Sequence, residues 1–150
     1  MKLPKWSRPF LIATNAFNSI AGFVCGLLFL IAPDGRLMGA GDGGLLAMMQ
    51  NFPFADTFFR DFRWTGIAML LMLAIPGTAA TVALIRRIEP QYLVAYAASR
   101  LLFLFCLIEL LFLPNPLVIV FMIIAIIQTI IIMRIVKANK TRAKESEIIS

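Results

Sequence analysis

Histidine is absent from this chain of 150 residues, and the absence removes several kinds of chemistry at once. It excludes haem ligation by histidine, histidine-based zinc sites, histidine general bases and histidine pH sensors. The two cysteines, Cys25 and Cys106, each stand alone in an apolar run without a C-x-x-C motif, so they fix no redox compartment. The sequence therefore indicates no metal site and no cofactor.

Charge is also scarce. Charged residues make up 15% of the chain against 61% hydrophobic residues, and a soluble domain of this size could not bury so much apolar surface. The net charge of +6 comes from Lys and Arg residues split among loops and tail. Because no basic stripe is interleaved with aromatic residues, nucleic acid is not an expected partner. Composition predicts an integral membrane protein.

Four apolar runs are long enough to cross a bilayer as helices, at residues 10–32, 64–85, 92–113 and 117–133. The first run would form a helix of roughly 35 Å and exceeds the apolar core of a signal peptide, about 7 to 15 residues, which predicts an uncleaved anchor. We expect an all-α fold, a single transmembrane domain over 1–150 arranged as a four-helix up-down-up-down bundle.

The distribution of Lys and Arg predicts the orientation of this bundle. Three precede the first span, two lie between the second and third, and five lie in the tail at 134–150, whereas only three lie between the first and second spans and none between the third and fourth. The positive-inside rule places both termini in the cytoplasm, in a bacterial inner membrane. The basic tail is expected to be a helical extension of the fourth span that contacts anionic lipid headgroups, and a protein partner fits it equally well.

The connection at residues 33–61 is the one long loop. Its segments Leu45–Met49 and Phe52–Phe59 are apolar enough to lie in the membrane interface. Its glycines are not a phosphate-binding loop, because neither a preceding strand nor the Lys and Ser or Thr of such a motif is present. In the second span, Pro76 and Gly77 predict a kink, with nearby threonines placed to satisfy the carbonyl that proline leaves free.

Polar residues within the spans gather at similar depth in the half predicted to be cytoplasmic. We expect a polar cluster centred on Arg100, because an intramembrane charge normally faces protein or water rather than lipid. The stripe at residues 15, 19, 22 and 26 shares one face of the first helix and should turn toward the bundle. The other residues expected in the cluster are Asn15, Asn18, Thr78, Thr81 and Gln128. Their alternative role is to hold helices together, and Arg100 has the further alternative of snorkelling to the surface.

Glu109 lies nine residues from Arg100 on the opposite face of the third helix, so the two cannot pair. It lies near the other membrane interface, at the height where the second span begins. There we predict an ion pair between Glu109 and Arg63, with Arg60 as the second choice.

Asp34 and Gly35 follow the first span, and Phe59-Arg60-Asp61-Phe62 and Gly66 open the second, within a stretch that covers about a fifth of the chain. In these residues the sequence resembles small bacterial four-helix membrane proteins of the DoxX-like kind. The resemblance implies a four-helix membrane bundle and little about activity. Small multidrug transporters also have four helices but carry a Glu in the first span, which this chain lacks.

Two functions are compatible with these features. The first is a non-enzymatic accessory or regulatory subunit, or a homo-oligomer, because the topology is well specified and no catalytic constellation is evident. The alternative is binding or transport of a small anionic or amphipathic molecule, with Arg100 as counter-charge. An enzyme is disfavoured because the spans contain neither histidine nor paired carboxylates.

Overall fold

The computed structural model describes residues 5–40, 44–50, 54–58, 60–112 and 116–149. All regular elements in these ranges are helical. Four helices are long and apolar enough to cross a membrane, namely Ser7–Ile31, Arg63–Arg86, Gln91–Leu111 and Pro116–Asn139. The predicted all-helical fold with four membrane-length helices is confirmed.

The first span is one unbroken helix, and the second consists of three consecutive helical pieces. In chain order the elements are α1 (Ser7–Ile31), the 3-10 turn η1 (Arg36–Met38), α2 (Gly44–Gln50), α3 (Ala55–Phe58), α4 (Arg63–Met69), the π-helical segment η2 (Leu70–Ala74), α5 (Ile75–Arg86), α6 (Gln91–Phe112) and α7 (Pro116–Ile149).

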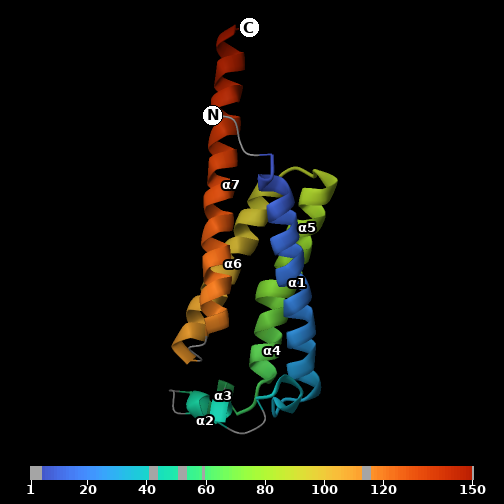
Figure 1. Ribbon diagram of the computed structural model, residues 1–150, viewed down its shortest axis with the longest axis vertical. Coiled ribbons are helices and arrows are strands. Elements are labelled where there is room, and N and C mark those ends of the chain that lie inside the picture. The colour runs from blue at the N-terminus through green and yellow to red at the C-terminus, as the bar shows by residue number, and fades with distance from the viewer. Residues whose placement is uncertain (1–4, 41–43, 51–53, 59, 113–115, 150) are drawn as a thin grey trace.

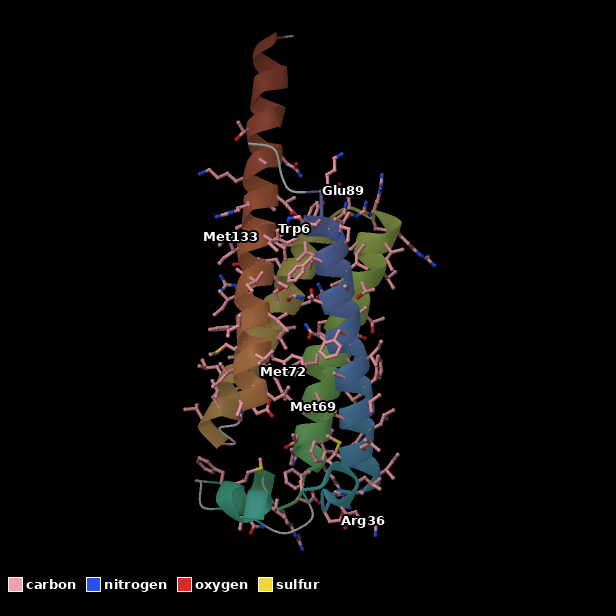
Figure 2. All side chains as sticks on the ribbon, in the orientation of Figure 1. Trp6, Arg36, Met69, Met72, Glu89 and Met133 are labelled. Carbon is pink, nitrogen blue, oxygen red and sulfur yellow. The ribbon has the colours of Figure 1, made fainter. Side chains whose placement is uncertain are left out.

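The connections divide the molecule into two ends (Figure 1). The start of α1, the turn between α5 and α6 and the far part of α7 lie at one end, which we call the terminal end. The short helices α2 and α3 lie at the opposite end, the loop end. In Figure 2, Trp6 and Glu89 mark the terminal end and Arg36 marks the loop end.

The long helices pack in the order in which they follow one another. α1 lies along α4, η2 and α5; α5 packs on α6; and α6 packs along α7, whereas α1 and α7 touch at few points. One buried apolar cluster, around Leu11, Leu84 and Ile132, lies toward the terminal end, and a second, around Leu73, Leu102 and Val118, lies nearer the loop end. The gap between α1 and α7 makes room for the site described below.

Small residues bring α1 against the second span. A Cβ added at Gly22 would lie 2.8 Å from the backbone nitrogen of Ala74, and one added at Gly66 would lie 2.7 Å from the carbonyl oxygen of Gly26. Gly77 meets the backbone of Asn15 in the same way. The four stripe residues of α1 are all buried, so the prediction that this stripe faces the bundle is confirmed.

The second span accommodates Pro76 by widening the turn before it. Through η2, the Ile75 amide bonds to the Leu70 carbonyl five residues back, in place of the usual four. Thr78 Oγ1 donates to the Ala74 carbonyl at 2.8 Å and Thr81 Oγ1 to the Gly77 carbonyl at 2.7 Å. The threonines therefore bond carbonyls next to the interruption, and not the carbonyl four residues before the proline as expected.

The loop end contains a tightly packed corner. Gly35 has a positive φ of 77° and lies so close to the Phe62 ring that an added Cβ would be 2.8 Å from it. The Phe62 amide donates to the Pro33 carbonyl at 2.9 Å, and its ring stacks on Phe29 with centroids 4.9 Å apart. This corner contains residues on which the DoxX-like resemblance is based, and it fixes where α4 begins relative to the end of α1.

Of the two segments expected in the membrane interface, the first is found as α2. Met49 on α2 is buried against Phe29 and Phe62, so this helix packs on the protein at the loop end. The second segment contains α3, and its residues 52, 53 and 59 lie outside the described ranges.

The last helix is longer than the predicted fourth span. α7 continues without a break past residue 133, where the apolar span was expected to end. It projects beyond the other helices at the terminal end (Figure 1). The basic segment at 134–150 is thus a continuation of the spanning helix over the described residues.

Candidate functional site

Gln128 on α7 joins three helices through its side-chain amide. Its Nε2 donates to Thr14 Oγ1 on α1 at 2.6 Å, and its Oε1 accepts from Ser99 Oγ on α6 at 3.0 Å. The two hydroxyls also donate to their own helices, Thr14 to the Phe10 carbonyl at 2.8 Å and Ser99 to the Ala95 carbonyl at 2.9 Å. Because Gln128 and Ser99 are fully buried, this network holds α1, α6 and α7 together in the half toward the terminal end.

A second polar contact joins α1 to the interrupted second span. Ser19 Oγ lies 2.6 Å from Thr78 Oγ1 and 3.1 Å from the Ala74 carbonyl oxygen. The Thr78 hydroxyl donates to the same carbonyl. The Ala74 carbonyl thus takes two hydroxyl partners where η2 gives way to α5.

The other polar residues expected in the cluster lie close to this region but do not join one network. Asn15 is buried and donates to the Leu11 carbonyl of its own helix at 2.8 Å. Asn18 is also buried, and its Oδ1 accepts no hydrogen bond from any residue in the described ranges. Thr81 bonds within α5. These positions match a role in packing helices more closely than a shared binding site.

Arg100 is the main departure from the expected arrangement. Its side chain is exposed on the surface of α6, where Nε and Nη2 both donate to Tyr96 Oη, at 3.0 and 2.8 Å. The guanidinium carbon also lies 5.0 Å from the centre of the Tyr96 ring. The structure does not bring Arg100 together with the buried polar residues, because Ala95, Ala98, Ser99 and Leu102 occupy the buried face of α6 and Arg100 projects from another.

The predicted ion pair at the other end is also absent among the described residues. Arg63 Nε pairs with Asp61 Oδ2 at 3.4 Å, and the amide of Arg63 bonds to the same carboxylate. Arg60 is exposed. Asp61 supplies a nearer partner two residues away, so Arg63 stays at the start of α4 and Glu109 has no cation beside it in the described ranges.

Glu109 instead lines a cavity of about 330 Å³ in the half toward the loop end. This cavity, which we call the loop-end cavity, lies between α1 and the second span on one side and α6 and α7 on the other. Its volume falls within the usual range for small-molecule sites, about 300 to 1,000 Å³. The lining residues are Phe17, Ala21, Cys25, Phe29, Met38, Phe62, Thr65, Met69, Leu73, Leu102, Phe105, Cys106, Glu109, Leu117, Val118 and Phe121.

Polar side chains are few in this lining. Glu109 carries the carboxyl group, Thr65 the hydroxyl, and Cys25 and Cys106 are both free thiols. Phe17 of α1 stacks on Phe121 of α7 with ring centroids 5.8 Å apart and bridges the two helices at the cavity. Met69 and Met72 lie on the second span, packed toward the cluster formed by α6 and α7 (Figure 2). The arrangement offers an apolar chamber with one strongly polar group.

Sequence reasoning missed Thr14 and Ser99 as partners of Gln128, and Arg8, whose Nη2 donates to the Leu84 carbonyl near the end of α5. A signal for Ser99 was present in the helical period of small residues. Ala95, Ala98 and Ser99 recur with Leu102 and Phe105 at helical spacing, which marks the buried face of α6. Glu109 continues that series four residues after Phe105, and Arg100 does not belong to it.

These features define a helical protein whose four long helices are compatible with membrane spans by length and hydropathy, as in a multi-pass membrane protein. No family model, curated protein or solved structure matches the chain.

Proposed function

We propose that this protein is a non-enzymatic membrane protein that binds a small amphipathic molecule in the loop-end cavity. The observation that carries the proposal is the cavity itself, about 330 Å³ of mainly apolar space lined from four spans with one carboxyl group in its wall. Predominantly apolar walls with a few polar groups are typical of small-molecule sites. Compared with the alternative drawn from the sequence, the binding site moves from Arg100 to the other half of the bundle.

The chemistry of the lining favours binding over catalysis. A general acid and base pair needs two titratable groups in reach of one substrate. The cavity offers Glu109 together with one hydroxyl and two thiols, and the chain has no histidine to complete such a pair.

The proposed setting is an up-down-up-down bundle in a bacterial inner membrane with both termini in the cytoplasm. The Lys and Arg distribution supports this orientation through the positive-inside rule. The start of α1 and the projecting part of α7 lie at the same end of the molecule (Figure 1). In this orientation the cavity lies in the periplasmic half of the membrane, and Arg134 and Lys137 on α7 are placed to meet anionic lipid headgroups.

Access to the cavity can be measured through its own cysteines. Cys25 is half-buried and Cys106 almost fully buried. Because the chain has two cysteines, the variant Cys106→Ala leaves the more accessible thiol, Cys25, as the reporter. In nanodiscs of zwitterionic lipid, 1-decanol is expected to slow alkylation of Cys25 by N-ethylmaleimide in a saturable way. In the further variant Ala21→Phe, which fills part of the cavity, this protection should weaken. Unchanged alkylation rates at all decanol concentrations would refute the proposal.

A second candidate function is an accessory or regulatory subunit, or a homo-oligomer. It is favoured by α7, which packs mainly along α6 and continues beyond the other helices at the terminal end. Mass measurement in nanodiscs and co-purification after cross-linking in cells test it. A monomer that brings down no membrane partner would exclude this candidate without affecting ligand binding.

A further inference from the structure

Glu109 is a charged residue within the spans that has no ion-pair partner among the described residues. It lies half-buried in α6 with apolar residues of three other helices around the same cavity. Ionisable residues at such positions are costly in a membrane and normally pair with another group. Within the ranges that the structure describes, no Lys or Arg lies within ion-pair distance of it.

The arginines at the loop end form no ion pair with Glu109 in the described structure, and Arg60 among them is exposed. Arg63 at the start of α4 is held by Asp61 through an ion pair and a backbone hydrogen bond. Arg36 near the end of α1 pairs with Asp34 in the same way, at 3.7 Å. Both arginines are mainly exposed. The cavity is therefore left with a carboxyl group and without a protein cation to match it.

From this juxtaposition we infer that the ligand of the loop-end cavity is a lipophilic amine, with its nitrogen on Glu109 and its apolar body between the four spans. This inference rests on the proposed function and names the class of its ligand. An ammonium group donates several hydrogen bonds to a carboxylate, and charge-assisted bonds of this kind are roughly twice as strong as neutral ones. The apolar body would contact side chains such as Phe17, Leu102 and Phe121, which line the cavity.

The same geometry disfavours other ligand classes. An anionic amphiphile would place like charges together in an apolar chamber, which costs free energy. A neutral alcohol would gain apolar burial but only a weaker hydrogen bond to the carboxyl group. A lipid acyl chain would fill the space and leave Glu109 without a partner. Among ligands of equal chain length, the cavity should therefore bind the cationic one most tightly, the neutral one less tightly and the anionic one least tightly.

The experiment compares decylamine, 1-decanol and decanoate as protectants of Cys25 in the Cys106→Ala protein, reconstituted in zwitterionic nanodiscs. Decylamine is expected to protect at concentrations about tenfold lower than 1-decanol, a difference of about 1.4 kcal/mol, and decanoate should protect least. Glu109→Gln should remove the advantage of the amine, so that decylamine and 1-decanol protect Cys25 at similar concentrations. The matched control Glu89→Gln, which removes an exposed carboxylate at the terminal end, should alter protection by neither compound.

The outcomes separate this inference from the proposed function. Equal protection by amine and alcohol, stronger protection by decanoate, or an amine advantage that survives Glu109→Gln would overturn the amine assignment while ligand binding stands. Absence of protection by all three compounds would refute the proposed function itself. The three-compound comparison in the protein with native Glu109 remains decisive even if the Glu109→Gln variant does not fold.

Discussion

Gln128 combines, in one side chain, contacts to two other helices, and the energy of this link is measurable. Replacement by Leu removes both contacts but leaves the Thr14 and Ser99 hydroxyls bonded to their own helices. No donor is stranded, so we expect a loss of about 0.6 to 2 kcal/mol in the free energy of unfolding. Titration with a denaturing detergent in mixed micelles, followed by circular dichroism, measures it.

A double-mutant cycle isolates the bond between Gln128 and Thr14, which lie 2.6 Å apart. The variants Thr14→Val and Gln128→Leu, singly and together, should show a coupling energy of about 0.6 to 1.7 kcal/mol. Additive effects would mean that this bond does not stabilise the fold.

Arg100 should behave in the opposite way. It is exposed, and the described structure pairs it with Tyr96 on the same helix, so its removal breaks no contact between helices. We expect Arg100→Leu to leave the free energy of unfolding within about 0.5 kcal/mol of the wild-type value or to raise it. The same detergent titration measures this, with Gln128→Leu as the destabilised reference. A loss above about 2 kcal/mol would return Arg100 to a structural role in the bundle.

Arg100 and Glu109 show which properties of a single residue can be predicted from this sequence and which cannot. Charge in an apolar run correctly drew attention to both, and Gln128 was correctly placed among interhelical contacts. Which face each residue occupies depends on the rotation of α6, and this follows from Ala95, Ala98 and Ser99 packing inward. Arg63 pairs with Asp61, two residues away, and not with Glu109. The predicted pair was based only on the estimated depth of each residue in the membrane, and such an estimate does not consider partners that are close in sequence.

At the scale of elements, the approach of α1 to the second span depends on glycine. Gly22→Ala would put a Cβ 2.8 Å from both the Ala74 nitrogen and the Leu73 Cβ. Since one neighbour is backbone and the other the root of a side chain, neither can turn aside. The helices must separate, and we expect a destabilisation of about 1 to 3 kcal/mol, measured by the same unfolding titration.

The control for this substitution adds volume where the helix is exposed. Ala79 lies on the outer face of α5, so Ala79→Leu should change the free energy of unfolding by less than about 0.5 kcal/mol. If Gly22→Ala were as neutral as Ala79→Leu, the close packing of α1 on η2 would not be a source of stability.

Element boundaries were predictable where a chemical signal marks them. Pro33 and Gly35 end the first helix, and the stripe of α1 indicated its buried face. Pro76 indicated an irregularity but not its form, which is the π-helical segment η2 just before the proline. The continuation of α7 through residue 149 agrees with the expected helical extension of the basic tail, since Lys, Arg and Glu are good helix formers.

For the whole molecule, the number of spans was predictable from hydropathy alone, whereas the cavity was not. The cavity exists because α1 and α7 contact each other at few points. The stacked rings of Phe17 and Phe121 bridge the two helices beside it. No local pattern specifies how far two helices that are not consecutive in the chain separate. The binding site could therefore be placed only once all four spans were seen together.

The orientation of the molecule is a prediction for the whole chain, because it depends on charges at both ends of every span. Ten Lys and Arg residues flank the spans at the terminal end and three at the loop end, so the terminal end should stay in the cytoplasm. A green fluorescent protein fused after Ser150 should fluoresce, and alkaline phosphatase fused after Gln50 should be active, because the first folds in the cytoplasm and the second requires the periplasm. When the two reporters are exchanged, the green fluorescent protein should not fluoresce and the alkaline phosphatase should be inactive. An active phosphatase after Ser150 would invert the bundle and move the loop-end cavity, with Glu109, to the cytoplasmic half of the membrane, where its ligand would have to be supplied from inside the cell.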